Sequence, residues 1–154
     1  MKSIKKLLVS GVGALLTLSL TTPAAAQSCW NGQAVKAAKV RDLQTLLMVG
    51  ALQCRTSQYD VLADYNKFVK AHRTTITTHN DVLKAHFKRV GNARGYDKFT
   101  TALANGRSAD TVDPEFCQET ADLAEKLVKA KPAEVEAIAD KFVDTPKGVG
   151  RSCS

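Results

Sequence analysis

The segment SQYDVLADYNKFVKAHRTTITTHNDVLKAHFKRVG, residues 57–91, decides the fold class of this chain. Apolar residues recur in it every seven positions, and a second series recurs with the same period three positions later. This alternating spacing of three and four is typical of an apolar seam along a helix, and neither Gly nor Pro interrupts it. The two series are Leu62, Val69, Ile76, Leu83 and Val90, and Tyr65, His72, His79 and His86.

We therefore expect one long helix from Ser57 to Val90, with Ser57 and Asp60 in a capping box and Gly91 as the C-cap. Its weak point is the Thr-rich stretch 74–78, because β-branched residues have low helix propensity. A kink, or a junction between two helices, at this stretch is the alternative. The apolar stripe is wider than a two-stranded coiled coil needs, so we expect the helix to face a globular core.

Shorter helical patterns lie on both sides of this segment. One spans about Ala34–Leu52, and another spans Gly95–Leu103 and is closed by Asn105-Gly106. Two more open at Asp113-Pro114 and at Lys131-Pro132, where proline suits the first helical turn. The pattern predicts an all-α, disulfide-stapled bundle of about five helices around one long central helix. Val135, Ile138, Ala139 and Phe142 are expected to point inward from the last helix.

The first 26 residues read as a secretory signal peptide. Basic residues, an apolar run over 7–20 and Ala24–Ala26 follow in the order that such a peptide requires. A retained membrane anchor is the alternative, although the run is short for a bilayer. Lipidation at Cys29 is another, although the bulky Gln27 directly ahead of Ser28 does not suit the small-residue site that lipidation requires. We expect a periplasmic or secreted protein without a membrane span after cleavage, in which 27–154 form a single domain with a loose tail from about 145 to 154.

The charge of the chain suits a solvated surface with weak attraction to acidic partners and does not indicate a nucleic-acid binder. The net charge is +7, and cleavage of the signal peptide would remove three lysines, which leaves the exported chain only mildly basic. A basic cluster surrounds the end of the long helix and is a candidate contact for an acidic partner or an anionic surface. Its alternative is a solvated face favoured by the helix dipole. The basic cluster comprises Lys84, Lys88, Arg89, Arg94 and Lys98.

Four cysteines in an exported chain predict two disulfides. None are spaced as Cys-x-x-Cys, which excludes thioredoxin-type and zinc-ribbon motifs. Of the three pairings that four cysteines allow, we favour Cys54 with Cys117 and Cys29 with Cys153. The first two lie on apolar helix faces, and the other two lie near the chain ends, where termini often meet.

No catalytic motif is present, and we expect no cofactor and no metal site. Histidines seven apart on a helix are separated by about 10.5 Å, so two of them cannot ligate one metal ion. We interpret His72, His79 and His86 as packed seam residues. Together with Tyr65 they are also candidates for pH sensing or ligand binding.

The features together favour a non-catalytic exported protein that acts by binding another protein, in stress protection or inhibition. Two alternatives remain. One is a carrier of a small molecule, haem or metal on the histidine-lined helix, and the other is a hydrolase of the cell envelope.

Overall fold

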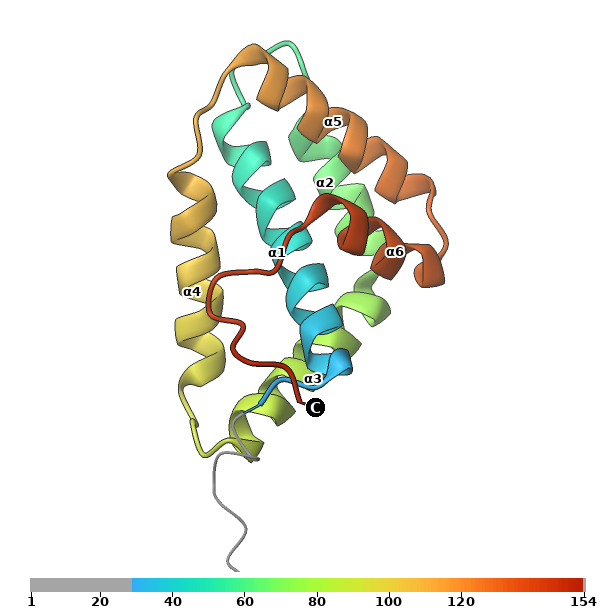
Figure 1. Cartoon of the computed structure of the whole chain (residues 1–154). Helices are drawn as coiled ribbons and strands as arrows, with labels where there is room; N and C mark the ends of the chain where they lie inside the picture. Colours follow the sequence, from blue (N-terminus) through green and yellow to red (C-terminus); the bar gives the residue numbers. More distant parts are fainter. Residues whose placement is uncertain (1–28, 154) are drawn as a thin grey trace, which may run out of the picture.

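The computed structural model describes residues 29–153, which form six α-helices (Figure 1). Within this range the all-α bundle with two disulfides is confirmed, and an isolated bridge joins Trp30 to Ser152. None of the six helices is both long enough and apolar enough to cross a membrane. They are α1 (Gly32–Gln53), α2 (Val61–Ala71), α3 (Arg73–Arg89), α4 (Gly95–Ser108), α5 (Pro114–Lys129) and α6 (Pro132–Phe142).

The central element is α1 and not the segment at 57–90. Figure 1 shows α1 running through the middle of the bundle, and it packs against each of the other five helices. Its buried residues lie on several sides, as expected of a helix that is enclosed on all sides. At Gly50 the close packing is extreme, since a Cβ there would lie 2.5 Å from Thr120 Cγ2.

The expected long helix is two helices, α2 and α3, which meet at His72. The prediction of a continuous helix is therefore wrong. The alternative of a junction is correct in kind, but the junction precedes the Thr-rich stretch 74–78, which lies inside α3. Both helices contact α1, but α2 packs mainly against α5, whereas α3 packs mainly against α1 and also contacts α4. We infer that these different packing partners decide where the helix divides.

Two predicted helix ends differ in the structure, the start of α2 and the end of α4, whereas Gly91 ends α3 as expected. α2 begins after Asp60, whose carboxylate accepts a hydrogen bond from the Ala63 N–H, so Ser57 is not the N-cap. α4 continues through Asn105-Gly106 to Ser108. Gly91 follows α3 with a φ of +72°, the left-handed conformation that favours glycine at this position.

Two seam or stripe positions face solvent instead of the core. Leu62 is 47% exposed, because Val61 and Phe68 supply the buried face of α2. Phe142, at the end of α6, is 45% exposed, while Val135, Ile138 and Ala139 are buried as predicted. The period of the sequence identified these segments as helical but placed these two side chains on the wrong side.

Two large clusters of buried side chains fill the bundle. The aliphatic core joins α1, α2, α3, α5, α6 and the residue after α6. The aromatic core joins Trp30, α1, α3 and α4. The members of the aliphatic core are Val40, Leu43, Leu47, Phe68, Ile76, Leu123, Ala124, Leu127, Val135, Ile138, Ala139 and Val143. The members of the aromatic core are Trp30, Ala34, Ala37, Ala38, Leu83, Phe87, Phe99 and Leu103.

The disulfides have the predicted pairing. Cys54 and Cys117, with Cα atoms 5.6 Å apart, lie buried between the end of α1 and the start of α5. Cys29 and Cys153, with Cα atoms 5.0 Å apart, join the two ends of the described residues. Two disulfides are typical of an oxidising compartment outside the cytoplasm.

The tail is held by more than its disulfide. The Trp30 N–H donates to the Arg151 carbonyl at 2.8 Å, and the Cys153 N–H donates to the Trp30 carbonyl at 2.9 Å. Val149 packs against the aromatic core. Backbone hydrogen bonds and apolar packing therefore hold the tail in addition to the disulfide. The predicted signal peptide, residues 1–26, lies outside the described residues.

Candidate functional site

The three histidines are buried in separate surroundings. At the junction of α2 and α3, His72 Nε2 lies 2.8 Å from the Leu127 carbonyl oxygen. A carbonyl only accepts, so this nitrogen carries the proton and donates it. His72 Nδ1 is buried and has no hydrogen-bond partner among the described residues.

His79, in the middle of α3, faces a carboxylate from α6. Its Nε2 lies 3.3 Å from Glu136 Oε1. Burial lowers the pKa of His79 below its usual value, the charge of Glu136 opposes this shift, and the charge of Lys36 reinforces it. His79 is therefore held largely as the neutral imidazole near pH 7.

His86 belongs with the aromatic core. Its ring lies 4.0 Å from the Trp30 ring, centroid to centroid, and Arg89 Nη2 is 3.0 Å from His86 Nδ1. A guanidinium can only donate, so Nδ1 accepts this hydrogen bond. Burial lowers the pKa of His86, and the charge of Arg89 lowers it further. Burial of the histidines, as predicted from the seam, is confirmed.

The structure does not bring the histidines together into one site. Each ring is engaged by different neighbours, and across residues 29–153 no group of three or more His, Cys, Asp or Glu side chains could hold a metal ion. The fourth candidate, Tyr65, is partly buried and packs against both the aliphatic core and the cluster around the Cys54–Cys117 disulfide. This arrangement gives no support to a carrier built on a histidine-lined helix.

The basic cluster lies at the α3–α4 end of the molecule, with all five side chains at exposed positions. Two of its members are engaged internally. Lys84 forms an ion pair with Asp81 at 3.3 Å and lies 5.5 Å from the centre of the Tyr96 ring, and Arg89 donates to the Cys29 carbonyl. A shallow hollow of about 430 Å³ lies between Lys84, Lys88 and Tyr96.

A larger hollow, the apolar groove, lies where α1, α5 and α6 meet. Its volume is about 490 Å³. Leu46, Phe116, Leu123 and the exposed Phe142 give it an apolar lining. Its rim carries Glu119, Asp122 and Lys126.

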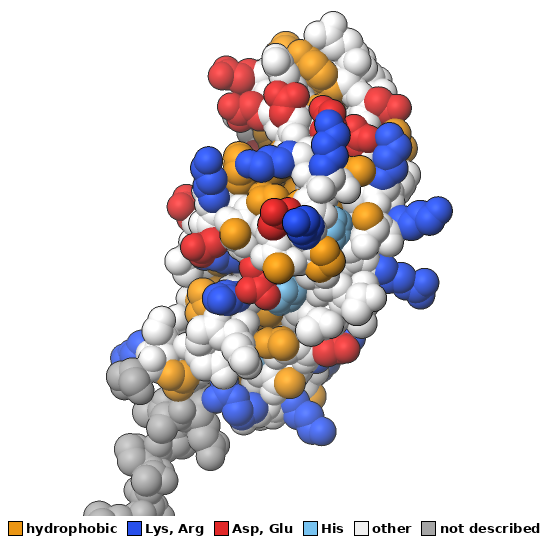
Figure 2. Space-filling model, turned by 90° about the vertical axis from the view of Figure 1, so that its right-hand side faces the viewer, with side chains coloured by type: hydrophobic (Ala, Val, Ile, Leu, Met, Phe, Trp, Pro, Cys, Tyr) orange, Lys and Arg blue, Asp and Glu red, His pale blue; other side chains and the backbone are white. Residues whose placement is uncertain are grey.

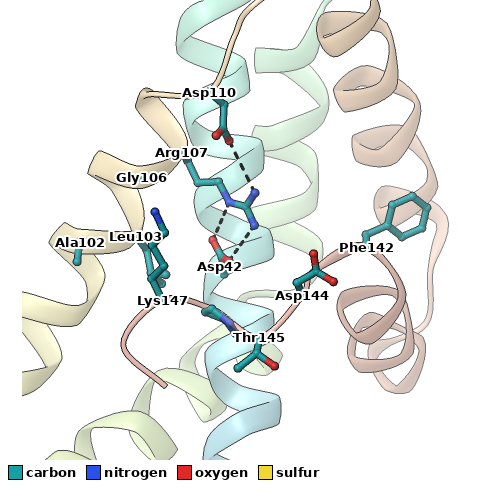
Figure 3. Close-up of a pocket in the computed structure, with 11 residues that line it drawn as sticks. Asp42, Ala102, Leu103, Gly106, Arg107, Asp110, Phe142, Asp144, Thr145 and Lys147 are labelled. Carbon is teal, nitrogen blue, oxygen red and sulfur yellow. Dashed lines mark hydrogen bonds and ion pairs between the residues drawn. The ribbon is translucent and has the colours of Figure 1, made fainter. Parts of the chain in front are cut away.

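A polar pocket of about 220 Å³ lies between α1, α4 and the chain after α6 (Figure 3). At its base, Arg107 donates two hydrogen bonds to Asp42, from Nε to Oδ1 at 2.9 Å and from Nη2 to Oδ2 at 2.8 Å. The Asp42 side chain is only 6% exposed and that of Arg107 is 25% exposed. Asp110, 3.8 Å from Arg107 Nη1, and Asp144 complete the acidic lining.

The sequence did not reveal the apolar groove or the polar pocket. One signal was present, because Asp42 is the only acidic residue of α1, a helix that is buried on several sides, and a buried carboxylate requires a partner. Arg107 is 65 positions away, and the sequence does not link the two. Phe142 was named, but as a core residue.

No protein-family model, no curated protein and no solved structure matches this chain. Its function must therefore be argued from its own residues.

Proposed function

We propose that the chain is an exported, non-catalytic helical protein that acts by binding another protein. The observation that carries this proposal is the apolar groove between α1, α5 and α6, with Phe142 partly exposed at its edge. Scattered exposed apolar residues are ordinary on protein surfaces. An aromatic side chain beside a concave apolar surface is instead typical of an interface centre.

The charge and compartment of the chain agree with this proposal. The two disulfides support export to the periplasm or the medium, as does the N-terminal segment that reads as a signal peptide. Phe142 stays exposed although two lysines lie over its ring, Lys126 at 5.3 Å and Lys141 at 5.7 Å from its centre. Stress protection and inhibition of an envelope enzyme are the two roles for which such binding is suited.

The test compares how variants at two exposed apolar positions retain a binding partner from the envelope proteins of the native host. The full exported protein is immobilised as wild type, as Phe142→Asp and as Leu52→Asp. Leu52 is 62% exposed and does not line the groove, so it is a matched control. We expect the wild type and the Leu52→Asp variant to retain the same protein and the Phe142→Asp variant to lose it.

Circular dichroism and a melting curve of each variant check that the fold is intact. Phe142→Ala provides a second groove variant without a new charge. Equal retention by all four proteins, or no specific retention by the wild type, would contradict the proposal.

A further inference from the structure

The apolar groove and the polar pocket are neighbours. Phe142 lines both of them. On α1, Asp42 lines the pocket and Leu46 lines the groove, and residues four apart on a helix stack on one face about 6 Å apart along the axis. The two hollows therefore offer one surface with an apolar half and a polar half.

The polar half carries an excess of acid. Asp42 and Arg107 neutralise each other through their two hydrogen bonds. The remaining charged groups of the lining are Asp110, Asp144 and Lys147, so the pocket is net negative. A side chain entering it meets carboxylates from two walls, one after α4 and one after α6.

The rim of the apolar half also carries a net negative charge. Glu119 and Asp122 line it from α5, and its lysine, Lys126, lies over the Phe142 ring. Figure 2 shows acidic side chains gathered at the end of the molecule where α5 begins. A partner that reaches both hollows therefore meets apolar surface bordered by negative charge.

We propose that this surface binds an amphipathic helical segment of a partner protein, with apolar residues in the groove and a lysine or arginine in the polar pocket. The proposal rests on the proposed function and specifies the chemistry of the partner. Helices bind grooves through apolar residues spaced at i, i+3, i+4 and i+7. Along α5 the lining runs from Phe116 to Lys126, about 15 Å, which matches roughly three turns of helix.

The α2 face of a second copy fits this surface poorly. Its exposed apolar side chain would have to be flanked by basic residues. Leu62, which is exposed on α2, lies between Asp60 and Asp64. Its insertion would bring carboxylates against the acidic rim, and like charges in contact disfavour association.

The experiment uses two synthetic probes with the full exported protein. One is an amidated helical peptide of about 14 residues, the length of four turns, with leucines at i, i+3, i+4 and i+7 and lysines elsewhere. The other has glutamate in place of each lysine. Binding is measured by isothermal titration calorimetry at low and at physiological salt.

We expect the lysine peptide to bind at least about tenfold more tightly than the glutamate peptide, with the preference falling at higher salt. Asp110→Asn combined with Asp144→Asn should reduce the preference about threefold or more. Asp81→Asn combined with Asp97→Asn removes the same charge at the opposite, α3–α4 end and should leave the preference unchanged.

Three results would overturn the inference. They are equal binding of both peptides or of neither, a preference that survives the Asp110/Asp144 changes, and self-association of the wild type that Phe142→Asp abolishes. If Phe142→Asp still loses the native partner while the charge preference is absent, the proposed function stands and only this inference falls.

Discussion

The two halves of α1 support two different cores. The first half turns Ala34, Ala37 and Ala38 toward the rings of the aromatic core, and small side chains let those rings approach the helix backbone closely. The second half turns larger side chains, such as Leu43 and Leu47, toward the aliphatic core. One helix thus changes its packing partner along its length, from aromatic rings to branched aliphatic chains.

The two cores are closed by different means. Helices α5 and α6 cover the aliphatic core. The aromatic core is covered on one side by the two ends of the described residues, where Trp30 and Val149 pack and which the Cys29–Cys153 disulfide joins. The comparison teaches that the first core depends on side-chain packing between helices, whereas the second also depends on a covalent link.

The largest expected effect is in the aliphatic core. Leu47→Ala removes a fully buried side chain among packed neighbours, so we expect the free energy of unfolding to fall by about 3–5 kcal/mol. Leu52→Ala, at an exposed position of the same helix, should change it by less than about 0.5 kcal/mol. Urea denaturation followed by circular dichroism measures both, and similar losses would contradict this account of the core.

The next effect concerns the link between the chain ends. Replacing Cys29 and Cys153 with serine should lower the free energy of unfolding by about 2–4 kcal/mol, because the disulfide closes a long loop. The loss should concentrate in the aromatic core. In native-state hydrogen exchange, amides around Phe99 should become less protected relative to those around Leu47, and a uniform loss would show that the two cores unfold as one.

A smaller effect is expected at the boundary between the cores. Asp42→Asn leaves the Arg107 guanidinium without its carboxylate partner, and we expect a loss of about 1–3 kcal/mol. Arg107→Gln should cost at least as much, because the buried Asp42 then lacks a cation. In a double-mutant cycle the combined loss should be smaller than the sum, whereas additive losses would indicate that the pair is not coupled.

Local features of the fold could be predicted from the sequence. The Asp113 cap, which accepts a hydrogen bond from the Phe116 N–H at 2.8 Å, and the turn at Gly91 depend on residues within a few positions. The division at His72 could not be predicted in the same way. The seven-residue period continues through it, and the main packing partners of α2 and α3, which differ, lie far away in the sequence.

The candidate surface was largely hidden from sequence reasoning for a similar reason. The Asp42–Arg107 pair and the groove join residues that are far apart along the chain, and no period relates them. Phe142 continues the apolar pattern of α6, yet it lies in the last turn, where the pattern does not show whether another helix covers the side chain. The sequence did indicate that the histidines are buried, because all three lie on the seam.

The last and smallest expected effect is a difference between the two cores in how their stability depends on pH. Burial lowers the pKa of both His79, near Glu136, and His86, in contact with Trp30 and Arg89. The unfolded chain therefore takes up protons before the folded chain as the pH falls below about 6.5. Stability that is fully present above this pH is lost on acidification, until the pH passes the folded-state pKa values.

His86 should contribute more of this acid sensitivity than His79. At His86 the Arg89 charge adds to the effect of burial, while at His79 the Glu136 carboxylate opposes burial more strongly than the Lys36 charge reinforces it. Free energies of unfolding at pH 7.5 and 5.5 for the wild type, His86→Gln and His79→Gln test this order. The His86 variant should show the weakest pH dependence, and in acid the wild type should lose hydrogen-exchange protection first around the aromatic core. An unchanged pH dependence in both variants would mean that acid acts through other groups, and the aromatic core would then differ from the aliphatic core in its covalent link but not in its response to protons.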